Sequence, residues 1–313
     1  MQLSDRIGKR IKLQDVHILM AVVEAGSMGK AARHLNTSQP NISKSIADLE
    51  RELGVRLLDR HRQGIKPTEY GRALLNGGVA VFDELRQTVK NIEFLADPTA
   101  GEVRVGCNSF LATSFASAVV DRSCRRYPRI MLHLTTGIFE GLCGQLVERY
   151  IDLFIARKIG PVIDERLNFE FLFDEPCIIA VGAQNPWARR RRIALADLLN
   201  ERWVLSSPGS AMASIAIEAF GASGLDYPRM TVTTDSPQVR MSLLATGRFL
   251  TIFPASVLRF PTQRLELRAL PIELPVGRLA SGIFTLKNRA PSPVARRFID
   301  TAHEVAKPLT KNK

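Results

Sequence analysis

Length, composition and charge describe a globular chain of two or three domains. It has 313 residues, of which 45% are hydrophobic and 24% charged, and no run of about 18 apolar residues that would form a transmembrane helix. The polar N-terminus has no apolar segment behind it, so we expect no signal peptide and a cytoplasmic protein. The four cysteines, Cys107, Cys124, Cys143 and Cys177, form no CxxC pair, which favours free thiols over disulfides or a zinc site.

The net charge of +12 suggests a polyanionic partner, but its distribution weakens that inference. Residues 1–100 hold 15 Lys and Arg against 12 Asp and Glu, a balance of +3, so the rest of the chain holds +9. Within residues 1–68 the balance is 12 against 7, or +5. Bulk charge therefore gives only weak support for DNA binding, which must rest on the motifs.

Three helices are expected near the N-terminus. Apolar residues recur at helical spacing over residues 13–25 and 28–35, and again in a third helix that begins after the N-cap Ser38 and ends at Gly54. One stripe of the third helix should be buried, and it consists of Ile42, Ile46, Leu49 and Leu53.

The opposite face of this third helix carries short polar and basic groups. Pro40, Ser43 and Lys44 lie on that face, and Gln39 lies at its exposed N-terminal end. Such a face suits a helix that enters the major groove, where Gln pairs with adenine and Lys with guanine or phosphate. A solvated surface helix would have the same character, so this face alone does not establish DNA binding.

A β-hairpin is predicted after the third helix. Val55–Arg60 and Ile65–Thr68 have the composition of strands, and the turn between them is basic and contains Gly64. This hairpin has the size of a wing, from which Arg60, Arg62 and Lys66 would reach the DNA backbone or minor groove.

Many positions of this module match one family in order: Ala31, Ala32, Leu35, Ser38, Gln39, Pro40, Ile42, Ser43, Leu49, Glu50, Leu53, Gly54, Val55, Leu57, Arg60, Pro67, Thr68 and Gly71. The run resembles the winged helix-turn-helix of LysR-type transcriptional regulators. Leu58, where the family usually has Phe, and Asn41, often small or apolar, depart from the pattern. The resemblance implies DNA contacts from Ser38, Gln39, Pro40, Ser43, Lys44, Arg60 and Arg62.

A long helix is predicted from Thr68 to Ala96, where proline is absent. Its apolar residues form two stripes offset by a slip, Leu75, Val79 and Phe82, then Leu85, Val89, Ile92 and Ala96. About 29 residues at roughly 1.5 Å each would overhang a small domain, so we expect a homodimer through this helix. The resemblance implies the same pairing and a homotetramer. Gly77-Gly78 suggests a bend, and Asp97-Pro98 ends the helix.

Strands and helices alternate after the linker, which indicates an α/β fold with a parallel sheet. Two α/β lobes accommodate these elements better than one continuous sheet. Strands are expected at 101–106, 130–134, 152–156, 177–181, 203–205, 230–233 and 249–253, with helices at 114–127, 139–150, 194–200, 210–223 and 236–246.

This half resembles the LysR-type effector domain, whose shape is that of a type 2 periplasmic binding protein. The residues that carry this resemblance are Gly137, the strand 151–156, Asp174-Glu175-Pro176, the segment 247–254 and the last helix from Arg297. The resulting division is a winged helix-turn-helix over residues 1–68, a linker helix over 69–97 and an effector domain over 98–313. Lobe I is expected at 101–173 and 282–305, and lobe II at 174–281.

Ligands of open α/β sheets bind beyond the carboxyl ends of the strands. The candidate effector-binding residues are Asn108, Ser109, Thr135, Thr136 and Arg157 in lobe I, with Ser207, Ser210, Thr234 and Phe253 in lobe II. A helix that opens at Ser210 and the surplus of positive charge favour a small anionic metabolite, such as a carboxylate or sugar acid. Helix capping is the simpler role for each hydroxyl, and a surface position is an equal alternative for Arg157.

No enzyme motif is present, since both GxxxxGK[ST] and a strand-following GxGxxG are missing and the five histidines are scattered. We therefore expect no catalytic residue, metal or cofactor. The expected partners are double-stranded promoter DNA and a small anionic metabolite, with RNA polymerase a further candidate. Two alternatives stay open: an architectural DNA-binding protein without an effector, and a solute-binding protein or enzyme. The run Arg189–Arg192 is expected in a solvated loop.

Overall fold

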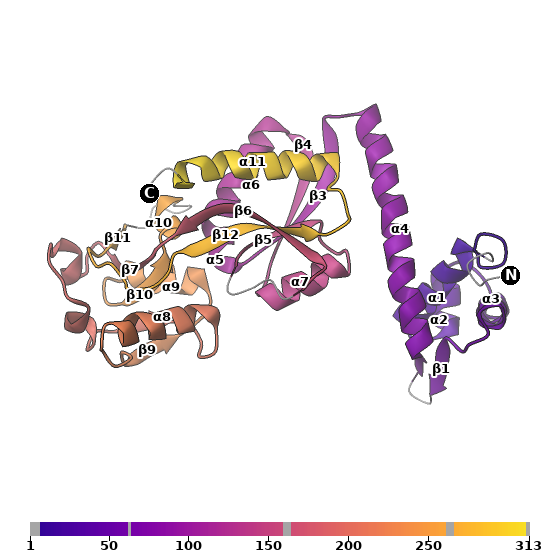
Figure 1. Cartoon of the computed structure of the whole chain (residues 1–313), viewed down its shortest axis with the longest axis horizontal. Helices are drawn as coiled ribbons and strands as arrows, with labels where there is room; N and C mark the ends of the chain where they lie inside the picture. Colours follow the sequence, from indigo (N-terminus) through magenta and orange to yellow (C-terminus); the bar gives the residue numbers. More distant parts are fainter. Residues whose placement is uncertain (1–6, 62–63, 159–163, 261–265, 311–313) are drawn as a thin grey trace. The chain divides into compact units, whose positions relative to one another are not determined.

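The computed structural model of the chain describes residues 7–61, 64–158, 164–260 and 266–310 (Figure 1). It separates into two compact units, Met1–Val89 and Lys90–Lys313, and the division falls inside one long helix. The N-terminal unit has one hydrophobic core and the C-terminal unit has several. Across the described residues, no helix is long and apolar enough to cross a membrane.

The N-terminal unit is built on three short helices, α1 (Leu13–Ala25), α2 (Met28–His34) and α3 (Gln39–Leu53). Gly26 and Gly54 end α1 and α3 with φ of 66° and 72°, a conformation that glycine adopts without strain. The predicted stripe of α3 faces the core, where Ile42, Ile46 and Leu49 are buried and Leu53 is half-buried.

The hairpin is shorter than the sequence suggested. β1 (Leu58–His61) and β2 (Gly64–Pro67) pair antiparallel. The preceding residues, predicted as strand, run along α3 instead. There Glu50 Oε1 accepts hydrogen bonds from the backbone N–H groups of Leu57 and Leu58, at 2.7 and 3.2 Å. This carboxylate ties the start of the hairpin to α3 and satisfies two donors that would otherwise lack partners.

The long helix α4 (Glu69–Ala96) runs without interruption for 28 residues. Gly78 does not break it, and its role is a close helix contact, because a Cβ there would lie 2.7 Å from Val16 Cγ1 of α1. Phe82 also faces α1, where its ring meets His17 edge-on with centroids 5.5 Å apart. The first predicted stripe therefore packs inside the N-terminal unit.

The second stripe of α4 faces solvent. Three of its residues and two neighbours form an apolar band, here called the outer seam, whose members are 45% to 79% exposed: Val81, Leu85, Val89, Ile92 and Leu95. Their spacing of four, four, three and three residues places all five on one side of the helix. The outer seam thus has the pattern of a helix–helix interface.

Lobe I of the C-terminal unit is a five-stranded sheet in the order β4-β3-β5-β12-β6. Its strands are β3 (Ala100–Cys107), β4 (Arg129–Thr136), β5 (Leu153–Arg157), β6 (Leu167–Glu175) and β12 (Leu279–Leu286). β3 runs parallel to β4 and β5, whereas β12 is antiparallel to β5 and β6. α6 (Ser117–Arg126) and α11 (Pro293–Thr310) cover one face, and α7 (Phe139–Val147) covers the other (Figure 1).

Lobe II is a second five-stranded sheet in the order β11-β7-β10-β8-β9. Its strands are β7 (Cys177–Gly182), β8 (Trp203–Leu205), β9 (Met230–Thr233), β10 (Leu250–Pro254) and β11 (Leu267–Ala269). β8 is parallel to β9 and β10, and β7 is antiparallel to β10 and β11. α8 (Ala211–Ala222) packs on one face and α9 (Pro237–Ala245) on the other.

The predicted two-lobed α/β architecture is confirmed, but the sheets are mixed rather than parallel. The chain passes to lobe II where β6 leads into β7, and it returns along β12; neither β6 nor β12 was expected from the sequence. The helical stretch predicted over 114–127 begins earlier, at Ser109, and consists of α5 (Ser109–Leu111), a π-helical turn (Ala112–Ala116) and α6. The helix predicted over 194–200 is a short 3-10 turn, Leu195–Leu198.

Candidate nucleic-acid interface and effector cleft

α3 presents its predicted polar face to solvent. Gln39, Pro40 and Lys44 are exposed, as is Ala47 one turn further along. Ser38 is the N-cap, and its Oγ accepts a hydrogen bond from the Asn41 N–H at 3.4 Å. A helix with small residues between its polar groups can approach base edges closely, so this face has the shape that major-groove binding requires.

Contacts with α2 hold two of the predicted DNA-binding side chains. Ser43 is half-buried, and its hydroxyl lies 3.1 Å from Met28 Sδ. The Gln39 amide oxygen lies over Gly29, where an added Cβ would be 3.3 Å away from it. The Ser43 side chain must therefore rotate away from Met28 to reach a base. The Gln39 side chain packs at the junction of α2 and α3 and remains exposed.

The hairpin packs against the turn between α1 and α2. Its register places Arg60 opposite Ile65 and Asp59 opposite the exposed Lys66. The Ile65 N–H donates to the Gly26 carbonyl at 3.1 Å, which fixes β2 against the turn between α1 and α2. Arg62 lies outside the described residues.

The carboxyl ends of β3, β4 and β5 meet at one edge of lobe I. This edge gathers the predicted residues Asn108, Ser109, Thr135, Thr136 and Arg157, because the register sets Cys107 opposite both Thr136 and Ile155. Asn108 caps α5, with its Oδ1 accepting from the Leu111 N–H at 3.0 Å. Ser109 is half-buried, and both threonines are exposed.

A matching edge of lobe II carries Ser207, Ser210, Thr234 and Phe253. Ser210 Oγ caps α8 by accepting from the Ala213 N–H at 3.2 Å. The Ser207 N–H donates to Asp235 Oδ1 at 3.2 Å. Burial raises the pKa of Asp235, but hydrogen bonds from Ser207 and Ser206 and the charge of Arg240 outweigh it, so the pKa lies below its ordinary value. Asp235 is therefore a carboxylate at neutral pH.

The two edges meet through an aromatic contact. Phe110, which follows the Asn108–Ser109 turn of lobe I, packs into an apolar cluster of lobe II. Its ring centroid lies 5.7 Å from that of Phe253, with the planes at 66°. This contact joins the two lobes next to Asn108 and Ser109 in the chain and at Phe253 itself.

A buried arginine that the sequence analysis missed lies beside this contact. Arg240 of α9 is 1% exposed, and it donates five hydrogen bonds to neutral oxygens of lobe II. Its guanidinium also lies over the Phe110 ring, 5.2 Å from the centroid. Burial lowers the pKa of Arg240 to about 10, so the group stays charged at neutral pH.

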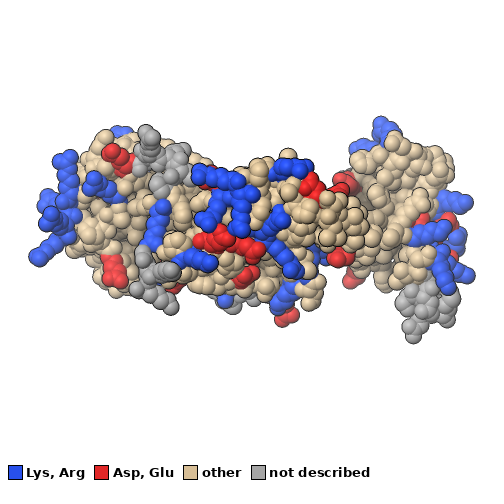
Figure 2. Space-filling view, turned by 90° about the horizontal axis from the view of Figure 1, so that it is seen from above, with Lys and Arg blue, Asp and Glu red and all other residues tan. Residues whose placement is uncertain are grey.

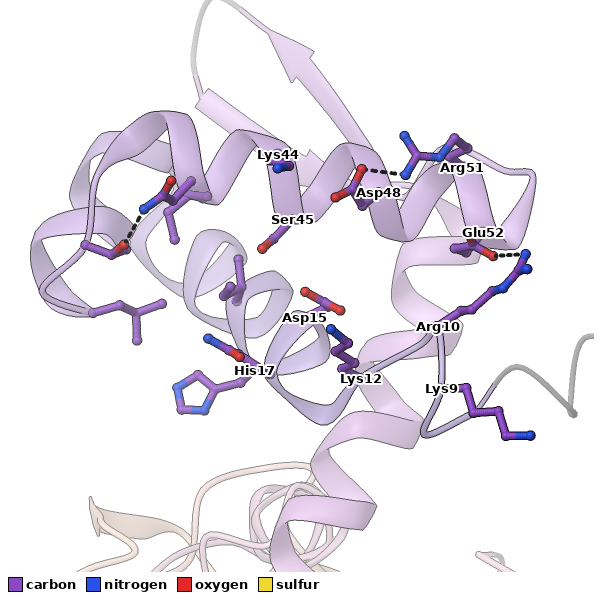
Figure 3. Close-up of a pocket in the computed structure, with 16 residues that line it drawn as sticks. Lys9, Arg10, Lys12, Asp15, His17, Lys44, Ser45, Asp48, Arg51 and Glu52 are labelled. Carbon is purple, nitrogen blue, oxygen red and sulfur yellow. Dashed lines mark hydrogen bonds and ion pairs between the residues drawn. The ribbon is translucent and has the colours of Figure 1, made fainter.

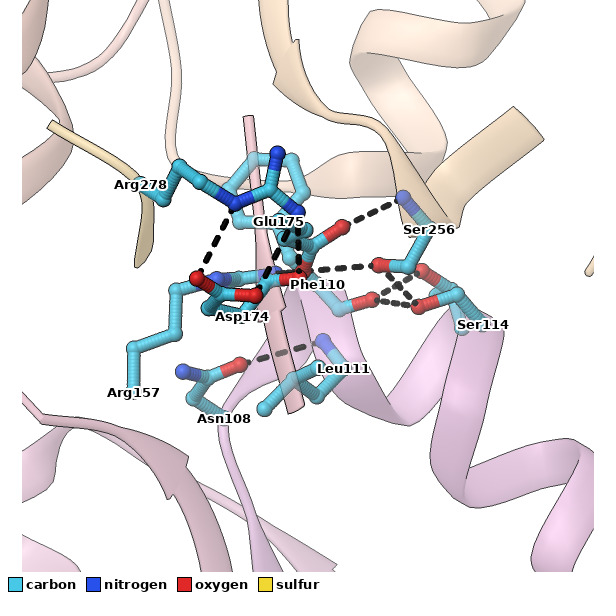
Figure 4. A network of polar contacts seen from close by, with 10 residues as sticks. Asn108, Phe110, Leu111, Ser114, Arg157, Asp174, Glu175, Ser256 and Arg278 are labelled. Atoms are coloured by element: carbon cyan, nitrogen blue, oxygen red, sulfur yellow. Dashed lines mark hydrogen bonds and ion pairs between the residues drawn. The ribbon is translucent and has the colours of Figure 1, made fainter. Parts of the chain in front are cut away.

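Arg157 is neither a surface residue nor an isolated charge. It pairs with Glu175 at 3.1 Å, and the two side chains are 3% and 6% exposed. Glu175 in turn accepts hydrogen bonds from the N–H and the hydroxyl of Ser256, the hydroxyl at 3.0 Å (Figure 4). This network joins β5 and the crossover end of β6 to α10 (Ser256–Arg259) of lobe II. Arg157 Nε is buried without a hydrogen-bond partner among the described residues.

The sequence contains little that would identify Arg240 or Glu175 as site residues. Arg240 shares one face of α9 with the buried Pro237, Met241 and Leu244, so the only indication was a charged residue within an apolar stripe. The sequence identifies Glu175 only as part of the crossover segment Asp174-Glu175-Pro176. Its partner Arg157 is 18 positions away and Ser256 is 81 positions away, distances over which local patterns carry no information.

The arginine run lies at the end of lobe II. Arg189 to Arg192 are all exposed, and Figure 2 shows basic side chains gathered at this end of the effector domain. The thiols differ in accessibility: Cys107 and Cys177 are buried, whereas Cys124 is exposed. Burial raises the pKa of the Cys177 thiol to about 12, which leaves it protonated and unreactive at neutral pH.

Comparisons with known proteins match both units. Residues 13–72 match the family described as "Bacterial regulatory helix-turn-helix protein, lysR family", and residues 96–307 match the "LysR substrate binding domain". The transcriptional dual regulator GltC of Bacillus subtilis is 28% identical over 290 residues, which cover 93% of this chain and 96% of GltC. The regulator GbpR of Azospirillum brasilense is 25% identical over 288 residues, covering 92% and 84%.

Solved structures share the fold. A full-length OxyR variant from Pseudomonas aeruginosa aligns with a TM-score of 0.66 and 20% identity, covering 96% of this chain and 98% of OxyR. CbnR in complex with its target DNA aligns with a TM-score of 0.62 and 22% identity, covering 94% and 99%.

The buried pair predicts a large difference between two neighbouring carboxylates. Glu175→Gln leaves the Arg157 charge buried without a counter-charge, which should cost about 3–5 kcal/mol. Asp174→Asn removes only an exposed pair with Arg278, worth about 0–1 kcal/mol. Urea unfolding followed by tryptophan fluorescence measures both, because Trp187 and Trp203 lie in lobe II. Equal shifts of the two unfolding midpoints would show that the pair does not stabilise the lobe junction.

Proposed function

The chain belongs to the LysR family of bacterial transcriptional regulators, and we propose that it recognises DNA through the exposed face of α3 and responds to a small carboxylate bound between its lobes. The observation that supports DNA recognition best is the combination of that face with a hairpin anchored on the same unit. Gln39 and Lys44 are exposed there, and the hairpin carries the exposed Lys66. The helix would provide base contacts and, through Lys44, a phosphate contact, while the hairpin and the helix N-terminus would contact further phosphates.

Two variants of α3 separate base contacts from phosphate contacts. Gln39→Ala should cost about 1–3 kcal/mol and relax the preference at one base pair, because Gln pairs with an adenine edge. Lys44→Gln should weaken binding to all DNA and lower the salt slope by about one, because one phosphate contact is lost.

Fluorescence anisotropy with a DNA fragment selected by the full chain measures both effects over a range of salt concentrations. Arg125→Gln is the control, since this exposed arginine lies on α6 in the effector domain. If both α3 variants bind DNA with wild-type affinity, the assignment of α3 as the recognition helix is contradicted.

The outer seam of α4 supports a homodimer. Five apolar side chains lie exposed along one side of the helix, and a second copy of the same helix would cover them symmetrically. A two-fold dimer presents two α3 helices to DNA, so we expect two half-sites about one helical turn apart, arranged as an inverted repeat.

The proposed effector follows from the groups at the two lobe edges. Ser109, Thr136 and Ser210 supply hydroxyls, and the first turn of α8 supplies N–H groups that favour an anion. Arg157 adds a buried positive charge with one unused N–H. Asp235 would accept hydrogen bonds from a ligand hydroxyl. Together these groups suit a hydroxycarboxylate or sugar acid better than an apolar compound.

A thermal-shift screen of hydroxycarboxylates and sugar acids against the full chain tests this proposal, because a ligand of the folded state raises its stability. The affinity of each hit should fall about 10- to 100-fold in Ser109→Ala and in Thr136→Ala, since each loses a hydrogen bond to a charged group. Ser214→Ala, one turn into α8, is the control and should bind as wild type does. Hits that bind both cleft variants with wild-type affinity would contradict the cleft assignment.

A further inference from the structure

A short basic turn precedes α1 and lies outside the family match, which begins at residue 13. The Gly8 N–H donates to the Ile11 carbonyl at 2.9 Å, and Ile11 packs partly buried against the core of the three helices. Arg10 pairs with Glu52 of α3 at 3.7 Å. The turn is therefore anchored on the N-terminal unit by one apolar and one ionic contact, and its position relative to α3 is defined.

A groove of about 760 Å³ separates this turn from α3 (Figure 3). Its charged lining consists of Lys9, Arg10, Lys12, Lys44 and Arg51, against Asp15, Asp48 and Glu52. Two of the acids already have partners, since Glu52 pairs with Arg10 and Asp48 with Arg51. Among the described residues, Lys9, Lys12 and Lys44 have no ion-pair partner within the structure. Five basic groups against three acidic ones leave a surplus of two positive charges along the groove.

The groove lies next to the proposed recognition face. Lys44 belongs to both, because it is exposed on the face with Pro40 and Ala47 and it also lines the groove with Asn41 and Asp48. At 100° per residue, Pro40 and Ala47 lie on one side of α3 and Asn41 and Asp48 on the adjacent side, with Lys44 between them. A helix inside the major groove, about 12 Å wide, has a phosphate backbone along each side. The side of α3 that faces the basic turn therefore faces one of these backbones.

We propose that Lys9 and Lys12 bind the DNA phosphate backbone that flanks the sequence recognised by α3. The inference rests on the proposed α3 contact, because α3 sets the position of the DNA. Both lysines are exposed, and Figure 3 shows Lys9 extending away from the helices at the outer end of the groove. Lysine acts as a point charge on phosphate, so the contact adds affinity without sequence preference. Because Ile11 holds the turn in place, little ordering is needed on binding.

The salt dependence of DNA binding by the full chain tests the proposal. Lys9→Gln/Lys12→Gln should lower the salt slope by about two, because each phosphate contact contributes roughly 0.9. The ratio of wild-type to variant affinity should then fall about tenfold between about 50 and 200 mM salt. Lys287→Gln/Lys307→Gln removes the same charge from exposed positions of the effector domain and should leave the slope unchanged.

Hydroxyl-radical footprinting adds a positional readout, in which backbone protection next to each half-site should disappear in the Lys9→Gln/Lys12→Gln variant. If the Lys9→Gln/Lys12→Gln variant keeps the wild-type salt slope while Lys44→Gln lowers it, the inference is overturned and the assignment of α3 as the recognition helix stands. If Lys9→Gln/Lys12→Gln and Lys44→Gln both keep the wild-type salt slope, the assignment of α3 is contradicted as well. If the Lys287→Gln/Lys307→Gln control lowers the salt slope as much as Lys9→Gln/Lys12→Gln does, the effect comes from net charge and the inference is overturned.

Discussion

The exposed apolar surface of α4 is the constraint on which the rest of the molecule depends. From Val81 to Leu95 the outer seam leaves five apolar side chains in water, each 45% or more exposed. Removing such surface from water yields about 25 cal/mol per Å², so a partner that covers the seam is strongly favoured. A second α4 would cover it with a matching pattern, and the resulting two-fold axis would determine how two α3 helices are presented to DNA. In the proposed dimer, the symmetry of the DNA site follows from this helix.

The lobe junction is the second constraint, and it involves charge rather than apolar surface. Arg157, Glu175 and Ser256 form a buried network between elements of both lobes, and Arg240 lies buried against Phe110 beside it. Buried charges tolerate few arrangements, because each must keep its partners. Lobes connected in this way favour a small number of discrete positions. A ligand that binds one of these positions more tightly would shift the population towards it, which is the physical requirement for regulation.

The N-terminal unit could be predicted from sequence because its determinants are local. The caps at Ser27 and Ser38, the glycine ends and the stripe of α3 all act within a few residues. The roles of Ser43 and Gly78 could not be predicted in this way. Ser43 faces Met28, and Gly78 admits Val16, so both depend on how helices pack. Phe82 illustrates the same limit, because periodicity placed it in an apolar stripe but could not show that α1 covers it.

The effector domain was predicted in outline and missed in detail. Strands flanked by helices were identified, but β12 pairs with β5 and β6 from more than 100 positions along the chain, and only tertiary structure brings it there. The candidate effector residues follow the carboxyl ends of strands in the two lobes, and of this set only Phe253 has a ring contact with Phe110 of the other lobe. Arg157 was identified by its position at the carboxyl end of β5, whereas its partner Glu175 and the buried Arg240 depend on long-range contacts that the sequence does not display.

Sedimentation equilibrium of the full chain tests the central claim most directly, since it measures association through the outer seam. Wild type should be a dimer or larger at micromolar concentration. Leu85→Glu/Ile92→Glu should raise the dissociation constant by more than about tenfold, because two charges would be buried in the seam. Ile217→Glu, at an exposed apolar position on α8, should leave association unchanged. A monomeric wild type, or equal association of all three proteins, would contradict the account.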